Sequence, residues 1–262
     1  MIRVEAWGVG ASVVDEGRLG RASFGAGRGG AVDAAALRLA NRLLGNPPGA
    51  AGIETSGGTT INLEHAAMVA ITGAVADVVV VGGPPVGWGA PIVLPAGAKV
   101  RVGRLVDGAR TYLGVRGGLG VDADRLEVGP DPGTAAALEA APRQPSRTTI
   151  RVWPGPRLDW FDADAWHVLT STPFTVAATN RVGTRLAGLG LGRVRRDELP
   201  SEGLLEGAVQ VPPDGQPIVM LAAHPTTGGY PVVAVVDPDD IAHVAQAARG
   251  TVLRFTSEFP QG

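Results

Sequence analysis

Four short clusters of polar side chains contain the residues of this 262-residue sequence that are best suited to chemistry. They are DEGRLG at 15–20, TNRVGTRLAG at 179–188, SEG at 201–203 and HPTTGGY at 224–230. Taken singly, each cluster is best explained by tight turns and local ion pairs. Together, their guanidinium, hydroxyl and amide groups indicate a binding site for a carboxylate or ureido group.

Chemical roles for these clusters follow from residue type. Guanidinium groups suit a substrate carboxylate or a developing oxyanion, and carboxylates serve as general bases or orient the guanidinium groups. The candidate catalytic residues are Asp15, Arg18, Asp33, Arg181, Arg185 and Glu202. The candidate substrate-binding residues are Asn180, Gln210, Thr226, Thr227, Gly228, Gly229 and Tyr230. The two glycines are expected to turn the chain with exposed N–H groups, as in anion-binding loops.

Composition and motif spacing exclude several other classes of site. The net charge of −2, without a basic run, argues against a nucleic-acid partner. There is no cysteine, and the four histidines show no metal-ligand spacing, so no metal is expected. GAGRGG at 25–30 matches a dinucleotide fingerprint but lacks the buried strand that must precede one. No phosphate-binding loop of the GxxxxGK[ST] type is present.

Hydrophobic patterning predicts a mainly β protein with a few helices. Strands are expected at 2–7, 60–63, 67–72, 77–81, 92–94, 98–106, 109–116, 149–153, 174–179, 207–211, 217–222, 231–236 and 251–256. One helix is expected over 34–44 with Asp33 as its N-cap, a second around 162–170, and a third after Asp237. Asn41 lies on the apolar face of the first helix, where a structural hydrogen-bonding role is favoured over a place in a site.

The irregular stretch between about 120 and 148 suggests a surface excursion and a linker. Two domains are therefore predicted, 1–147 and 148–262, each a β-barrel carrying one or two helices. The apolar stretch from Ala66 to Gly83 is interrupted by Gly73 and Asp77 and predicts two strands, with no membrane span. The N-terminus shows no secretory pattern, so a cytoplasmic location is expected.

The clusters, in their order along the chain, resemble the biotin-dependent carboxyltransferase family of allophanate hydrolase subunit 2. The matching motifs are DEGRLG, GAVDAAALRLANRLLGN, GIETSGGT, ITGA, TNRVGTRL, SEGLLEGAVQVPPDGQPI and TTGGYPVVAVV. The resemblance spans residues 8 to 236. It implies two cyclophilin-like β-barrel domains and a partner protein of the B type (allophanate hydrolase subunit 1), with a further component of the A type.

The resemblance implies one of three activities. The first is the role of the C component in an ATP-dependent 5-oxoprolinase, which opens 5-oxoproline to glutamate and binds ATP through the complex. The second is transfer of a carboxyl group from carboxybiotin to urea or a related amide. The third is a non-catalytic, regulatory role on a partner protein of the B type.

Three departures from the family pattern bear on that choice. The family has Asp and Gln where this chain has Ala223 and Pro225. The turn before the first helix is altered to GAGRGGAVD, and a hydroxyl-rich loop is replaced by DADRLEVGPDPG at 122–133. With these changes, the sequence favours the non-catalytic role more than the sequence of a standard family member would.

Overall fold

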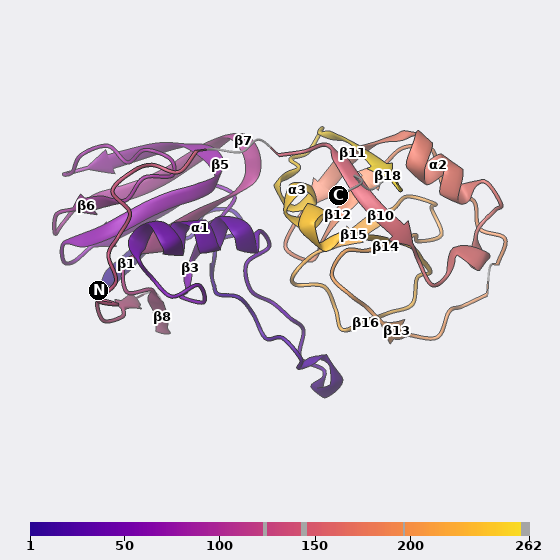
Figure 1. Cartoon of the computed structure of the whole chain (residues 1–262), viewed down its shortest axis with the longest axis horizontal. Coiled ribbons are helices and arrows are strands. Elements are labelled where there is room, and N and C mark those ends of the chain that lie inside the picture. The colour runs from indigo at the N-terminus through magenta and orange to yellow at the C-terminus, as the bar shows by residue number, and fades with distance from the viewer. Residues whose placement is uncertain (123–124, 143–145, 196, 258–262) are drawn as a thin grey trace. The chain divides into compact units, whose positions relative to one another are not determined.

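The computed structural model describes residues 1–122, 125–142, 146–195 and 197–257 (Figure 1). The chain forms two compact units. The first comprises Met1–Gly17 and Asp33–Pro145, and the second comprises Arg18–Val32 and Ser146–Gly262. The segment Arg18–Val32, here called the arm, therefore leaves the first part of the chain and packs with the second unit. The predicted boundary at 147 did not anticipate this excursion, and the predicted linker residues 143–145 lie outside the described residues.

The first unit is built on a nine-stranded, nearly closed sheet with one covering helix. Its main path runs β2-β3-β7-β4-β1-β9-β8, and β5 pairs with both β6 and β7. Its elements are β1 (Ile2–Ala6), β2 (Ser12–Val14), α1 (Ala34–Leu44), β3 (Gly52–Thr55), β4 (Thr59–Leu63), β5 (Ala67–Val81), β6 (Ile92–Leu94), β7 (Lys99–Val115), β8 (Leu119–Asp122) and β9 (Arg125–Val128).

The second unit is a closed barrel with strand order β10-β17-β14-β15-β12-β11-β18. A separate two-stranded ladder joins β13 to β16. The elements are β10 (Thr149–Pro154), α2 (Ala165–Ser171), β11 (Pro173–Thr179), β12 (Gly183–Ala187), β13 (Glu202–Gly203), β14 (Ala208–Gln210), β15 (Ile218–Met220), β16 (Thr227–Gly228), β17 (Val232–Val236), α3 (Ile241–Gln246) and β18 (Val252–Thr256). Short 3-10 turns cover Ala22–Phe24 in the arm, Leu158–Trp160 and Pro238–Asp240. The predicted mainly β, barrel-type fold is confirmed.

Helix α1 confirms the prediction made from its capping signals. The Asp33 side chain accepts a hydrogen bond from Ala36 N at 2.9 Å, and Gly45 ends the helix in the left-handed conformation at φ 67°. Asn41 is fully buried and donates to the carbonyls of Pro48 and Ala50, at 3.0 and 2.8 Å. Its favoured structural role is therefore observed.

The two longest strands differ from the sequence prediction. Segments 67–72 and 77–81 form one strand, β5, and segments 98–106 and 109–116 form one strand, β7. Gly73 adopts a φ of 77° and the β5–β7 register shifts beside it, so the glycine bulges the strand without ending it. Similarly, the stretch predicted to be irregular contains the β8–β9 hairpin; Ala123 and Asp124, part of the altered 122–133 loop, lie outside the described residues.

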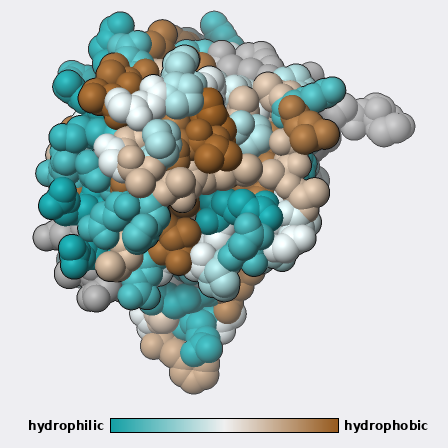
Figure 2. All heavy atoms as spheres, turned by 90° about the vertical axis from the view of Figure 1, so that its left-hand side faces the viewer, coloured by the Kyte–Doolittle hydropathy of each residue, from teal (hydrophilic) through white to brown (hydrophobic). Residues whose placement is uncertain are grey.

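Each unit has its own apolar core. The second is centred on residues such as Phe174 and Phe255, whose rings lie 5.9 Å apart. On the face shown in Figure 2, hydrophobic residues form small separate groups among hydrophilic ones. None of the described helices is both long and apolar enough to cross a membrane.

Candidate functional site

The segment His224–Tyr230, here called the TTGGY loop, is held by a short β-ladder in the second unit. Glu202 pairs with Gly228, Gly203 pairs with Thr227, and Leu204 N donates to the Thr226 carbonyl at 3.0 Å. Neither Gly228 nor Gly229 adopts the left-handed conformation, so the expected open turn of exposed N–H groups is replaced by a paired strand.

Gly228 is closely packed against two side chains. A Cβ atom at this position would lie 2.6 Å from Leu204 Cδ1 and 2.7 Å from Gln210 Nε2. Gln210 is buried and donates to the Tyr230 carbonyl at 2.9 Å, and Val211 N donates to the Pro231 carbonyl at 3.1 Å. Gln210, the last residue of β14, therefore fixes the backbone of the TTGGY loop.

The hydroxyl groups of the TTGGY loop are available to a ligand or a partner. Within the described part of the chain, the hydroxyls of Thr226, Thr227 and Tyr230 form no hydrogen bond. Thr227 is exposed, and Tyr230 is 45% exposed. Since the loop backbone is fixed by other contacts, these hydroxyls are presented on a rigid support.

Glu202 is engaged by an arginine distant in sequence. Arg157 Nε donates to Glu202 Oε2 at 3.0 Å, and Arg157 Nη2 contacts the second carboxylate oxygen. The hydrogen bond from Arg157 lowers the pKa of Glu202 below its ordinary value. A carboxylate with a lowered pKa is a weak base, so this arrangement suits positioning of the β13–β16 ladder better than proton abstraction.

Arg181 connects the second-unit loops to the arm. Its Nη2 donates to the Gly30 carbonyl at 2.7 Å, and its own carbonyl accepts from Ala223 N at 3.0 Å. Beside this contact, Gly29 N donates to the Ala222 carbonyl at 3.0 Å. Arg181 therefore contacts Ala223, the residue directly before the TTGGY loop.

A second arginine contact, between Arg28 and Glu206, also anchors the arm. Neither residue was among the predicted site residues, because Arg28 lies inside the glycine-rich motif that was rejected as a nucleotide site. The sequence does offer one signal for Arg28: it lies among glycines in a segment that contains no Asp or Glu, so any carboxylate partner must come from elsewhere in the chain. Its partner is 178 residues away (206 minus 28) and is not identifiable from local pattern.

Four further candidates are already engaged by other residues of the chain. Asp15 accepts from Gly17 N at 2.7 Å within a turn, and Asp33 caps α1; both belong to the first unit. Asn180 accepts from Val182 N and Gly183 N, and Arg185 pairs with Asp214 at 3.2 Å. These contacts support structural functions.

Arg18 and His224 are the other polar residues near the arm and the TTGGY loop. Arg18 has an exposed side chain, and its N–H donates to the Arg28 carbonyl at 2.7 Å, which closes the base of the arm. His224 is buried, and its Nδ1 lies 2.7 Å from the Pro225 carbonyl. Among the residues that the structure describes, no three His, Asp or Glu side chains gather in a group that could hold a metal ion.

Comparison with known proteins explains why these motifs occur together. The family model for the carboxyltransferase domain, subdomain A and B, matches residues 24–123 and 121–257. The chain belongs to this carboxyltransferase-domain family. The match covers most of both β units, without β1 and β2, and includes residues 24–32 of the arm.

Two curated relatives of this carboxyltransferase-domain chain match it over nearly its whole length. It is 33% identical to the C subunit of 5-oxoprolinase from Escherichia coli, covering 97% of this chain and 90% of the relative. It is 30% identical to the C subunit of 5-oxoprolinase from Haemophilus influenzae, covering 94% and 87%. The relatives are named as subunits, which implies that they work with other subunits.

Solved structures of larger proteins contain the same fold. TTHA0988 is 32% identical with a TM-score of 0.85, and the Kluyveromyces lactis urea carboxylase is 23% identical with a TM-score of 0.86. This carboxyltransferase-domain chain is covered to 98% and 97%, but it spans 55% and 27% of those chains.

Proposed function

We propose that this chain is the C component of a 5-oxoprolinase-type complex that opens 5-oxoproline to glutamate at the expense of ATP. The observation that carries the proposal is the match to two 5-oxoprolinase C subunits over 97% and 94% of the chain. The complex would supply a partner of the B type, a component of the A type and the nucleotide site, since this sequence has no phosphate loop. The predicted cytoplasmic location stays a prediction.

Within that complex, the TTGGY loop is proposed to face the lactam substrate or the protein that holds it. Thr227 and Tyr230 present hydroxyl groups that the described residues leave without hydrogen-bond partners, and these suit an amide carbonyl or N–H. Arg181, positioned through Gly30, is proposed to bind the substrate carboxylate through its guanidinium. The carboxylates Glu202 and Asp33 are proposed to act as positioning groups because both are already engaged.

The test is reconstitution with the proteins encoded beside this chain, followed by measurement of 5-oxoproline-dependent ATP hydrolysis. The reconstituted complex is expected to be active. Tyr230→Phe and Thr227→Val are expected to lower kcat/KM roughly tenfold each, equivalent to about 1.4 kcal/mol. Thr175→Val serves as the matched control, because Thr175 is an exposed threonine of β11 outside the TTGGY loop. Full activity in both loop variants would remove the loop from the site.

A second candidate is a non-catalytic partner of a protein of the B type. It is favoured by Ala223 and Pro225 in the TTGGY region and by the engagement of Glu202 with Arg157. This candidate predicts a stable complex that hydrolyses no ATP with 5-oxoproline.

A third candidate, transfer of a carboxyl group from carboxybiotin to urea, is supported by the match to the Saccharomyces cerevisiae urea amidolyase. The identity is 25% over 91% of this chain and 16% of that protein. Adding urea and a carrier that bears carboxybiotin, and measuring the urea-dependent loss of the carboxyl group from biotin, separates it from the first two.

A further inference from the structure

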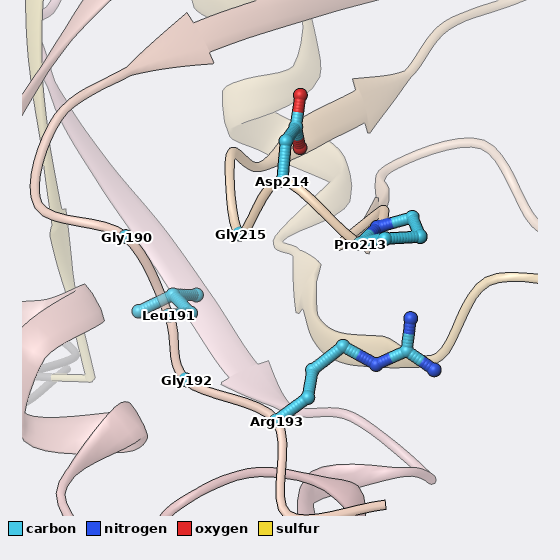
Figure 3. Close-up of a pocket in the computed structure, with 7 residues that line it drawn as sticks. All are labelled: Gly190, Leu191, Gly192, Arg193, Pro213, Asp214 and Gly215. Carbon is cyan, nitrogen blue, oxygen red and sulfur yellow. The ribbon is translucent and has the colours of Figure 1, made fainter. Parts of the chain in front are cut away.

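A hollow of about 570 Å³ opens in the second unit between two loops (Figure 3). Gly190, Leu191, Gly192 and Arg193 from the loop after β12 form one side, and Pro213, Asp214 and Gly215 between β14 and β15 form the other. The volume falls within the range of small-molecule sites. None of these residues belongs to the TTGGY loop.

Arg193 is the cationic side chain among these lining residues, and its donors are not used. Its Nε atom is buried and donates to no residue that the structure describes. Within the same part of the chain, no carboxylate forms an ion pair with its guanidinium. Because Nε is closed to solvent, the donors that a ligand in the hollow could reach are Nη1 and Nη2, and no hydrogen bond or ion pair within the described residues uses them.

The orientation of Arg193 is set without consuming those donors. The guanidinium carbon lies 5.8 Å from the centre of the Trp160 ring, and a β-bridge joins the backbone of Arg193 to Phe161. Arg195 lies over the same ring at 5.7 Å but pairs with Asp159 at 3.1 Å. Both guanidinium groups therefore pack on the Trp160 ring, and of the two only Arg193 has no carboxylate partner among the described residues.

The carboxylates near the hollow limit the charge of a ligand. Asp214 is engaged by Arg185 at 3.2 Å and by Gln216 N at 3.0 Å, and Figure 3 shows its carboxylate directed away from Arg193. The Asp162 carboxylate packs against Gly192, where any Cβ atom would overlap it. One available guanidinium, with the Asp162 carboxylate close to the same loop, disfavours a dianion, whereas a single carboxylate matches the guanidinium fork.

We propose that this hollow binds a small monocarboxylate through a bidentate contact with Arg193. The site is separate from the TTGGY loop, and the proposal stands independently of the 5-oxoprolinase-type function.

The experiment uses the full chain labelled with ¹⁵N-arginine and follows the Nε–H resonances by NMR during titration with sodium acetate at constant ionic strength. The Arg193 resonance, assigned by its loss in Arg193→Lys, is expected to shift saturably. Arg193→Gln is expected to weaken acetate binding at least tenfold, measured by saturation-transfer NMR. Arg193→Lys, which keeps the charge but loses the fork, is expected to weaken it severalfold.

Arg195→Gln is the matched control, since Arg195 shares the Trp160 support but does not line the hollow; it is expected to bind acetate like the unmodified chain. Equal weakening in Arg195→Gln and Arg193→Gln would overturn the proposal by showing non-specific attraction. Absence of a saturable shift would also overturn it. Inorganic phosphate binding more tightly than acetate would refute the assignment to a monocarboxylate. Unchanged thermal midpoints confirm that the variants are folded.

Discussion

At the scale of single residues, close packing explains more of the TTGGY loop than backbone flexibility does. Gly228 lies in a strand with ordinary backbone geometry, directly against Leu204 and Gln210. Gln210 in turn holds the Tyr230 carbonyl. The glycine was predicted as a turn residue because sequence alone does not reveal which neighbour lies within van der Waals distance.

Gly228→Ala is expected to destabilise the second unit by about 1–3 kcal/mol, because the added methyl group overlaps two side chains that are themselves packed. Urea unfolding, followed by tryptophan fluorescence, measures this loss. The control is Gly203→Ala in the same ladder, where a Cβ atom meets nothing within 4 Å. Equal stability of both variants would contradict the packing argument.

At the scale of elements, arginines tie the ends of helices and strands to distant segments. Arg116 follows β7 and donates to the Leu44 carbonyl at the end of α1, at 2.6 Å. It also donates to both oxygens of Asp131, each at 2.7 Å. The segment after β9 is thus connected to the end of α1 through one guanidinium. The periodicity of hydrophobic residues does not predict a contact of this kind.

The Arg116 contact makes a pH-dependent prediction. The hydrogen bonds from Arg116 lower the pKa of Asp131 to about 2. The stability that the ionised Asp131 carboxylate contributes is therefore fully present above the ordinary pKa of an aspartate, and it is lost as the pH falls through about 2. Arg116→Gln is expected to return the pKa toward about 3.9, measured by NMR titration of the carboxyl carbon. Arg125→Gln, which breaks the exposed pair with Glu64, is the control and should leave Asp131 unchanged.

At the scale of the whole molecule, the arm shows that the order of segments along the chain differs from their grouping in space. Residues 18–32 interrupt the first unit and pack with the second. Val32 enters the second core, and Arg28 pairs with Glu206. The exposed tip carries Phe24, which is 83% exposed. The second unit therefore needs residues from before α1 to be complete.

Glu206→Gln is expected to loosen the arm, because it leaves the Arg28 guanidinium without its carboxylate partner. Limited trypsin digestion should then cleave after Arg21 severalfold faster, as measured by mass spectrometry of the fragments. Glu16→Gln breaks the exposed Arg38 pair in the first unit and is the control. Unchanged cleavage in Glu206→Gln would show that the arm is held by its other contacts.

The sequence by itself determined the strand-rich character, the helix α1 with Asp33 and Gly45 at its ends, and the family, because these depend on local patterns and ordered motifs. Only the tertiary structure decided that Glu202 pairs with Arg157, that 227–228 is a strand, and that the arm docks on the second unit. It also showed that Asp15 and Asp33 make local contacts and that Arg185 pairs with Asp214. The physical reason is that pairing partners are selected by chain topology over tens to hundreds of residues, whereas caps and periodicity act within one or two turns.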